Sequence, residues 1–308
     1  MKPFVLKPIP DYTIWGCDRI SKARGYDKNY GTWWEVSAHP YCTNEVLNIE
    51  GNKTLQDLIN ENMEDVLGPG LTMHDVLRLA YLDTQDALSI QVHPYDEYAK
   101  ENANDYGKSE SWYILDAAKG ATLVAGTKTE DADVIKEALN NGTLEAYLKY
   151  VPVKKGDYII IPAGMLHALG KDILAIEVGT NSNTTYRFYD YKRKDASGNE
   201  RALHLKESFD VADFTLQPTF SKALEETHVI GDTPEFKVQE IYADGDRTIA
   251  VRKSYFIISN IENEIARIQW NDEIIEIPVY GSVFVPYSAK QITVLKGAHV
   301  LYSKPGLK

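Results

Sequence analysis

One segment, Gly156 to His167, constrains the fold and the chemistry of this chain more than any other. It reads Gly-Asp-Tyr-Ile-Ile-Ile-Pro-Ala-Gly-Met-Leu-His: an apolar run typical of a strand, a proline and a glycine typical of a turn, and then a histidine. A strand and turn of this kind bring one imidazole to the inner wall of a small β-barrel, where metal ligands commonly lie. The segment therefore predicts a β-barrel with a metal site.

Candidate partners for His167 lie upstream in the sequence. Gln91 and His93 are two residues apart, so on a strand they face the same side, and Glu110 opens another apolar run. Imidazole nitrogen with carboxylate and amide oxygen suits zinc with an open coordination position, and it can also hold other divalent first-row metals. Because an amide is a weak ligand, Gln91 could instead only orient the other ligands.

Length, charge and cysteine content exclude several classes of protein. A chain of 308 residues with 44% hydrophobic content can bury one elaborate core or two smaller ones. We expect no membrane span and no secretion, because no apolar run reaches about 20 residues and the first residues lack a signal pattern. Cys17 and Cys42 lack metal-type spacing, which favours a reducing cytoplasm. The net charge of −12 opposes nucleic-acid binding, and an anionic ligand would need a local cluster of cations.

The pattern of apolar residues predicts a mainly β chain with a few helices. Apolar residues at helical spacing from 55 to 67, after a Thr54 cap and before Gly68, predict one helix, and further helical patterns lie at 134–139 and 144–148. Period-2 alternation and β-branched residues dominate the rest, almost wholly so after residue 220. We expect a soft boundary within residues 220–232.

A faint internal repeat relates the two halves of the chain. The segment from Gly281 to Gln291 is similar to the segment from Gly156 to His167, with one residue deleted before the proline. In this second copy Ser288 stands in place of Gly164, and Gln291 stands in place of His167. The simplest interpretation is that the turn was kept for architecture while its metal ligand was lost, which gives one active and one inert barrel.

These motifs carry a resemblance to a known family. Gly156-x5-Pro162-x-Gly164-x2-His167 resembles the second motif of the cupin superfamily, and Gln91-Val92-His93 with Glu110 resembles its first motif with a glutamine replacing one histidine. Segments in one order along residues 14–191 further resemble type I mannose-6-phosphate isomerases in their short bacterial form: 14–16, 34–40, 89–94, 108–110, 162–169 and 184–191.

The resemblance implies a fold and a cofactor. We expect a mainly β fold of two cupin-like β-barrels, which are double-stranded β-helix jelly rolls, with a few helical inserts in the N-terminal half. Residues 1–225 would form the catalytic, metal-binding cupin domain, and residues 226–308 a cupin-like barrel without a metal site. One Zn²⁺ per chain would be held by His93, Glu110 and His167, with Gln91 as the fourth candidate.

The resemblance also implies an activity, the interconversion of mannose 6-phosphate and fructose 6-phosphate through an enediolate. Arg187 aligns with the catalytic arginine of the family, and its permanent charge suits an enediolate rather than the role of base. Glu177, Lys108 and a metal-bound water remain open as the base. Ser89, Lys108 and Arg193 align with positions that bind substrate, although Lys192-Arg193-Lys194 could equally be a solvated charge run.

One departure from the family pattern keeps other functions open. The family often has an aspartate four residues before the arginine, and this chain has Asn183 there. An isomerase or epimerase for another phosphorylated sugar therefore stays an alternative, as does a non-catalytic sugar-phosphate sensor. We expect a small sugar phosphate as the partner, with neither nucleic acid nor membrane, while the oligomeric state does not follow from the sequence.

Overall fold

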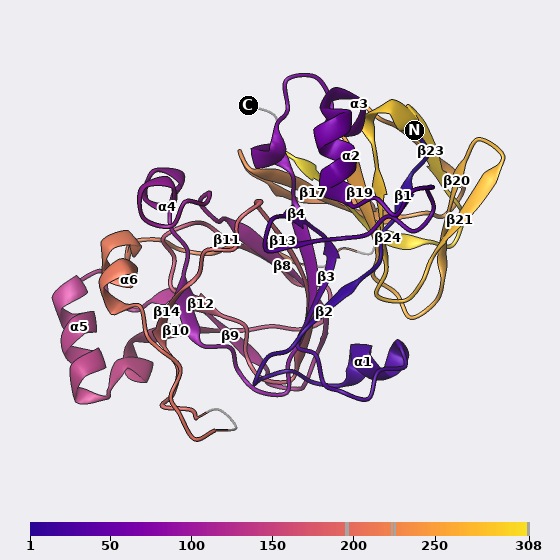
Figure 1. The fold of residues 1–308 in the computed structure, drawn as a ribbon. Coiled ribbons are helices and arrows are strands. Elements are labelled where there is room, and N and C mark those ends of the chain that lie inside the picture. Colours follow the sequence, from indigo (N-terminus) through magenta and orange to yellow (C-terminus); the bar gives the residue numbers. More distant parts are fainter. Residues whose placement is uncertain (195–196, 223, 225, 307–308) are drawn as a thin grey trace.

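The chain folds into two pairs of antiparallel sheets that lie side by side (Figure 1). The structure is a computed structural model that describes residues 1–194, 197–222, 224 and 226–306. One pair of sheets is built mainly from the first 221 residues and the other mainly from residues after 227. The predicted mainly β fold with two barrel-like units is confirmed.

The N-terminal pair consists of a seven-stranded and a five-stranded sheet. The seven-stranded sheet runs, from one edge to the other, β15 (Thr219–Ser221), β11 (Tyr158–Ile161), β8 (Glu110–Ala117), β13 (Ile173–Gly179), β6 (Arg78–Asp83), β3 (Thr32–Val36) and β2 (Ile9–Asp11). The five-stranded sheet runs β10 (Leu148–Pro152), β9 (Thr122–Thr127), β12 (His167–Ala168), β7 (Ile90–Val92) and β14 (Tyr186–Tyr189). Two short strands, β4 (Ala38–His39) and β5 (Cys42–Thr43), pair separately.

The C-terminal pair consists of a six-stranded and a four-stranded sheet. The larger runs β1 (Phe4–Val5), β22 (Ser282–Val285), β19 (Phe256–Asn260), β24 (His299–Pro305), β17 (Phe236–Tyr242) and β16 (His228–Asp232). The smaller runs β18 (Arg247–Ala250), β23 (Gln291–Val294), β20 (Ala266–Trp270) and β21 (Glu273–Ile277). Because β1 pairs with β22, the first strand of the chain belongs to the C-terminal pair. The proposed division at residues 225 and 226 stays a prediction, and β1 is an exception to it.

Both faces of the seven-stranded sheet are buried. On β8, Trp112 packs into the core inside the N-terminal pair, while its neighbour Tyr113 packs into a second core on the opposite face. Alternate side chains of a strand point to opposite faces, so a strand covered on both sides is apolar throughout. The second core joins this sheet to the C-terminal pair through residues such as Phe284 and Tyr255. A third core fills the C-terminal pair itself.

The helices lie around the outside of the sheets (Figure 1), with α3 beside the C-terminal pair, where the Leu67 carbonyl accepts from the Tyr255 N–H, and they test the helix predictions. The single helix expected from 55 to 67 is two helices, α2 (Leu55–Glu61) and α3 (Met63–Leu67), so that expectation was wrong. Asn62, at φ −145° and ψ 56°, leaves the helical region and separates them. The Thr54 cap is confirmed, because its side chain accepts a hydrogen bond from the Asp57 backbone N–H.

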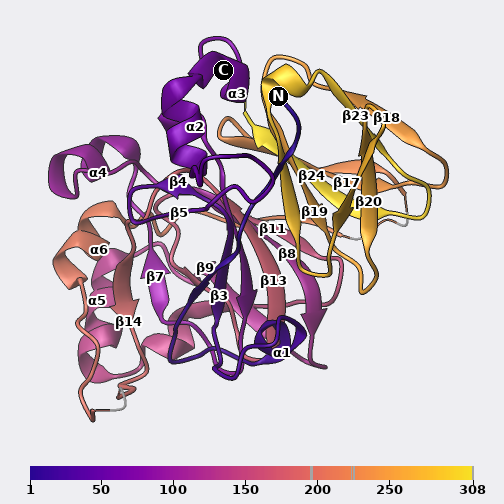
Figure 2. The ribbon, with the colours of Figure 1, turned by 45° about the vertical axis from the view of Figure 1, so that its right-hand side comes forward.

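The other helices are short and lie at the periphery. The second predicted helix is α5 (Ala132–Asn141), and the third is the 3-10 turn η2 (Leu144–Tyr147). The helices α4 (Asp96–Asn102), α5 and α6 (Leu205–Val211) gather on the side away from the C-terminal strands, as Figures 1 and 2 both show. Within the described chain, no helix combines the length and apolar character needed to cross a bilayer. The remaining pieces are α1 (Arg19–Ala23) and the 3-10 turns η1 (Met73–Asp75) and η3 (Tyr287–Ala289).

Candidate active site and metal centre

Three predicted ligands converge inside the N-terminal pair of sheets. His93 follows β7, Glu110 opens β8 and His167 opens β12, so the cluster joins the two sheets of the pair. One ligand atom from each lies within 4.8 Å of the others. The Nε2 atoms of His93 and His167 are each 3.3 Å from an oxygen of Glu110, and all three side chains are at most 1% exposed. A His-Glu-His group of this kind can hold a divalent metal ion.

The hydrogen bonds of the two imidazoles aim the same nitrogen of each ring at the cluster. Nδ1 of His93 lies 3.0 Å from the Thr184 carbonyl oxygen, and Nδ1 of His167 lies 2.7 Å from the Met165 carbonyl oxygen. Each Nε2 atom is buried and makes no hydrogen bond. A backbone carbonyl on Nδ1 fixes the tautomer that leaves Nε2 free for a metal. The donor set and its orientation therefore fit a bound divalent ion.

The charges around the cluster keep the ligands in metal-binding forms. Burial, together with the charge of Lys108, lowers the pKa of His93 to about 4, so its imidazole is neutral near pH 7. Burial opposes ionisation of Glu110, but Lys108 and the two imidazoles hold its pKa well below the ordinary value. A neutral imidazole and an ionised carboxylate are the forms that coordinate metals.

Gln91 lies on the strand that links the metal cluster to β14. Its Cα pairs with that of His167 on β12 on one side and with that of Arg187 on the other. The residue is half-buried and lines a cavity next to the cluster. The role of Gln91 stays a prediction: its amide binds the metal, or it orients the other ligands.

The cavity beside Gln91 has a volume of about 130 Å³ and a mixed lining. Two tryptophans and two leucines contribute apolar walls, and the polar residues come from β3, β6, β7, β13, the segment just before β8 and the segment 182–185. Its lining residues are Trp15, Thr32, Trp34, Arg78, Leu82, Leu88, Gln91, Lys108, Glu177, Ser182, Asn183 and Thr185. A second cavity of about 220 Å³ also includes Lys108 in its lining, but it lacks Gln91 and Glu177, and neither lining includes the three clustered ligands. The smaller cavity is thus the one beside the chemistry.

A lysine between two carboxylates connects this cavity to the metal cluster. Lys108 Nζ is 2.7 Å from an oxygen of Glu110 and 2.9 Å from an oxygen of Glu177. Burial alone would lower the pKa of Lys108, but the two carboxylates outweigh it and raise the pKa above the ordinary value. Burial and the neighbouring Glu110 raise the pKa of Glu177, against the opposing effect of Lys108. Lys108 is therefore protonated and positively charged, and the carboxylate of Glu177 is more basic than an ordinary glutamate.

The predicted arginines lie together but differ in their partners. Arg187, on β14, donates from Nη1 to the Ala202 carbonyl oxygen at 2.8 Å, while its buried Nε has no partner. Burial, and then the nearby charge of Arg201, lower its pKa. Arg193 donates to Asp190 and to the Ala87 carbonyl oxygen, both at 2.5 Å, and Arg201 shares the same Asp190. Arg193 and Arg201 thus both contact Asp190, Arg193 also lies 3.5 Å from Asp86, and Arg187 is close enough to be affected by the charge of Asp190.

The remaining predicted substrate residue, Ser89, is buried immediately before β7, with 6% of its surface exposed. The structure therefore brings together His93, Glu110, His167, Lys108 and Glu177 in direct contact. Ser89 and Gln91 lie along the adjacent strand, and Arg187 pairs with Gln91 through the backbone. Arg193 is not in the lining of the cavity.

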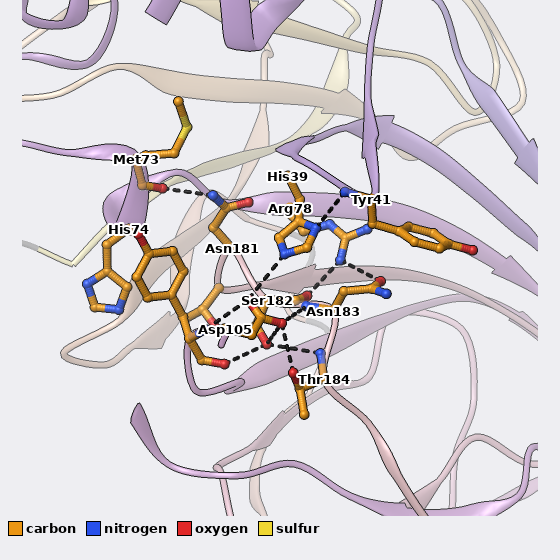
Figure 3. Close-up of polar contacts among 12 residues, drawn as sticks. His39, Tyr41, Met73, His74, Arg78, Asp105, Asn181, Ser182, Asn183 and Thr184 are labelled. Atoms are coloured by element: carbon orange, nitrogen blue, oxygen red, sulfur yellow. Dashed lines mark hydrogen bonds and ion pairs between the residues drawn. The ribbon is translucent and has the colours of Figure 1, made fainter. Parts of the chain in front are cut away.

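Sequence reasoning missed two charged residues beside the cavity, Arg78 and Asp105. Asp105 accepts hydrogen bonds from the Asn183 N–H and from the hydroxyl of Thr184, both at 2.8 Å, and its other oxygen lies 3.1 Å from Nε2 of His39 (Figure 3). It therefore holds the segment whose Thr184 carbonyl contacts His93. No sequence signal pointed to Asp105, but Arg78 interrupts an apolar strand pattern from Val76 to Tyr81, and that interruption was a usable signal.

Comparisons with known proteins identify a family. The model of the type I phosphomannose isomerase catalytic domain matches residues 17–133. Mannose-6-phosphate isomerase ManA of Bacillus subtilis is 34% identical over 274 residues, which cover 85% of this chain and 86% of the relative. The chain belongs to the mannose-6-phosphate isomerase family. A family member of Streptococcus mutans, named mannose-6-phosphate isomerase, is 33% identical over 267 residues, with 84% of each chain covered.

Solved structures of mannose-6-phosphate isomerases share the whole fold. The crystal structure of the Bacillus subtilis enzyme superposes with a TM-score of 0.84 at 28% identity and covers 98% of this chain and 99% of that one. A mannose 6-phosphate isomerase bound with zinc and yttrium superposes with a TM-score of 0.75 at 15% identity, over the full length of both chains. Both pairs of sheets are therefore part of the family fold.

Proposed function

We propose that this protein is a metal-dependent aldose-ketose isomerase that interconverts mannose 6-phosphate and fructose 6-phosphate through an enediolate. The observation that carries the proposal is the buried His93, Glu110 and His167 cluster, joined through Lys108 to a carboxyl group in the wall of an adjacent cavity. The reaction moves a proton between two neighbouring carbons, so it needs a base, an oxyanion-stabilising group and a site that excludes water. The cluster and the cavity offer all three.

The metal of the proposal is one Zn²⁺ per chain, with His93, Glu110, His167 and Gln91 as its ligands. The buried Nε2 atoms without hydrogen bonds support this assignment. When bound, such an ion supplies Lewis-acid polarisation of the substrate oxygens. The ligands' own contribution is orientation, because the carbonyl contacts of His93 and His167 fix both rings.

The proton-transfer groups of the proposal are Glu177 and Lys108. The raised pKa of Glu177 favours it as the base that takes the proton from the sugar carbon. Lys108 is held in its charged form by two carboxylates, so it is suited to donate to a developing oxygen charge and unsuited to accept a proton. Arg187 adds fixed positive charge near Gln91, and its unpartnered Nε leaves one donor free for substrate.

The phosphate end of the proposal uses Ser89, Lys108 and Arg193. Arg187, Arg193 and Arg201 outnumber the nearby aspartates Asp190 and Asp86, and this gives a local excess of positive charge, which a chain of net charge −12 needs to attract an anionic sugar. In this proposal Arg193 binds the phosphate group of the substrate and keeps part of its contact with Asp190. A cytoplasmic location also belongs to the proposal, since Cys17 and Cys42 are both free.

A coupled isomerase assay on purified, metal-replete protein tests the function. We expect turnover of mannose 6-phosphate to fructose 6-phosphate and very slow turnover of unphosphorylated mannose. Product analysis across the other hexose phosphates separates an isomerase or epimerase of different specificity, which would convert one of those sugars faster. Binding of mannose 6-phosphate without any product would instead support a non-catalytic sensor and reject the proposal.

A further inference from the structure

Arg78 is a buried cation in the wall of the cavity without a carboxylate partner. It begins β6 and is 2% exposed. Its ion-pair distances to all Asp and Glu side chains of the described chain exceed 4.0 Å, and none of its contacts carries a negative charge. A guanidinium removed from water is normally paired with an anion, because its burial is otherwise costly. The position is therefore incomplete until an anion arrives.

The contacts of Arg78 fix its side chain but do not neutralise it (Figure 3). Nη1 donates to the Ser182 carbonyl oxygen at 2.6 Å and to Asn183 Oδ1 at 3.0 Å, and Nε donates to Ser37 Oγ at 3.2 Å. Nη2 has only the weak acceptor Cys42 Sγ at 3.4 Å. The guanidinium also stacks 3.8 Å from the centre of the Trp34 ring. The group is thus rigid and charged, with its Nη2 donors nearly unused.

Nearby carboxylates are already committed to other donors. Glu177, in the same cavity wall, is paired with Lys108, and Lys108 is paired with Glu110 as well. Asp105, which holds the same segment, is occupied by His39 and by the N–H and hydroxyl donors of residues 182–184. Of the two cations that line the cavity, Lys108 forms ion pairs with two carboxylates, whereas Arg78 forms none and is felt by Glu177 only from beyond ion-pair distance.

We propose that Arg78 is a substrate-binding residue that takes an anionic oxygen of the sugar phosphate in this cavity. The inference rests on the proposed function and extends it to a residue outside the family-like motifs. Two groups of the substrate share the required chemistry, the phosphate and the enediolate formed during the reaction. A planar guanidinium with free donors suits either, because it makes paired, charge-assisted hydrogen bonds to such oxygens.

Asn183 gives the decisive test, because its Oδ1 already accepts from Arg78. Asn183→Asp keeps the shape and places a carboxylate on the guanidinium. If Arg78 waits for an anion, this change should raise the thermal midpoint of the free protein and lower kcat/KM for mannose 6-phosphate. Arg78→Met should lower kcat/KM by ~10- to 150-fold, the equivalent of a charge-assisted hydrogen bond. Arg78→Lys should recover part of that loss.

Kinetic parameters separate the two anionic groups. If Arg78 binds the phosphate, Arg78→Met should raise KM and weaken competitive inhibition by inorganic phosphate by the same factor. If it binds the enediolate, the variant should lower kcat and leave phosphate inhibition unchanged. In the Arg78→Met background, Asn183→Asp should add less than about a threefold further loss, since the guanidinium it would neutralise is gone.

A structural role for Arg78 would give a different result. Ser37→Ala is the matched control, because it removes the Nε acceptor but leaves the charge; it should lower the thermal midpoint and leave kcat/KM nearly unchanged. The inference is overturned if Asn183→Asp changes kcat/KM by the same factor with and without Arg78, or if Arg78→Met lowers the thermal midpoint and no kinetic parameter. Should the wild type not turn over mannose 6-phosphate, the proposed function fails by itself. In that case the thermal midpoint measured with inorganic phosphate still tests the role of Arg78. We expect phosphate to raise the midpoint of the wild type and not that of Arg78→Met.

Discussion

The two halves of the molecule contain the same turn with different chemistry. In the N-terminal pair, β11 leads through Pro162 to β12, and in the C-terminal pair β22 leads through Pro286 to β23. Both turns carry the chain from the larger sheet of the pair to the smaller one. The repeat predicted from the sequence is therefore a structural repeat.

The residue that opens the second strand differs in its surroundings. His167 is completely buried against Glu110, whereas Gln291 is exposed. Within the described ranges, the His93, Glu110 and His167 cluster is the one group of His, Cys, Asp and Glu whose geometry suits a metal. The turn thus provides architecture in both halves, and chemistry arises only where neighbouring strands supply further ligands.

The largest effect should come from making the first turn resemble the second. His167→Gln places in the N-terminal turn the residue of the C-terminal turn, and it should reduce metal content from about one equivalent per chain to near zero, with loss of turnover. Metal analysis of the purified variant measures this. Gln291→His is the control and should bind no additional metal, because no carboxylate and imidazole cluster faces it. Undiminished metal in His167→Gln, or two tightly bound ions in the wild type, would refute the assignment.

A second test asks whether the activity of the N-terminal half depends on more than its metal. Arg187→Ala should lower kcat by at least ~10²-fold, the scale seen when one preorganised oxyanion donor is lost. Metal content should stay at the wild-type level, because Arg187 contacts the Ala202 carbonyl and none of the three clustered ligands. Steady-state kinetics and metal analysis on the same preparation provide the measurement. An unchanged kcat with a higher KM would assign Arg187 to substrate binding alone.

The two turns should also differ in how much stability they lose when the residue of one turn is placed in the other. Gly164 has φ +83°, and a Cβ there would lie 2.3 Å from the Tyr95 hydroxyl oxygen. Gly164→Ser, which introduces the residue of the second turn, should lower the free energy of unfolding by roughly 1–3 kcal/mol. Ser288→Gly should cost only about 0.5–1 kcal/mol, from added backbone freedom. Urea unfolding compares the pair, and equal losses would show that the two turns share one backbone requirement.

The smallest effect concerns Glu35, which links the two halves. Burial raises the pKa of Glu35 to about 6, despite the opposing charge of Arg24, and Arg24 also donates to the Tyr280 carbonyl just before the second turn. The folded state therefore holds the proton more tightly than the unfolded state. Stability from this group is fully present below pH 4.5 and is lost as the pH rises through 6, by up to about 2 kcal/mol.

Paired unfolding experiments isolate that contribution. The free energy of unfolding of wild type minus that of Glu35→Gln should fall as the pH increases from 4.5 to 7.5. Urea titrations at several values of pH give this difference. A flat difference would mean that the pKa of Glu35 is the same in the folded and unfolded states, and a rising one would mean that Arg24 lowers the pKa in the folded state.

The parts of the site that depend on short sequence spacing were predictable. The close spacing of Gln91 on β7 and His93 just after it, and the turn that delivers His167, are local features that can be read from a short stretch of sequence. The contact between Lys108 and Glu177 was not, because it depends on the pairing of β8 with β13. The proposal of Glu177 as the base depends on that pairing, because the pairing places its carboxyl group beside the positively charged Lys108.

The remaining errors arose where the local sequence pattern carries too little information about the structure. The apolar stripe from 55 to 67 continues through Asn62, so periodicity alone could not reveal the break there. The short helices α4 and α6 each bury at most two residues, which leaves almost no apolar stripe to detect. Asp105 escaped notice because its importance lies in bonds to residues 182–184, far away in the sequence.

The pairing of β1 with β22 has a consequence for biosynthesis. Phe4 and Val5 lie opposite Phe284 and Val283, so these two residues find their strand partners in a segment that is synthesised much later. Until then the opening segment has no sheet to join, although it leads directly into β2 and β3 of the catalytic half. Contacts of such long range close slowly. The C-terminal sheet can therefore take up β1 only after β22 has been made, and a chain that stops before β22 leaves β1 without its strand partner.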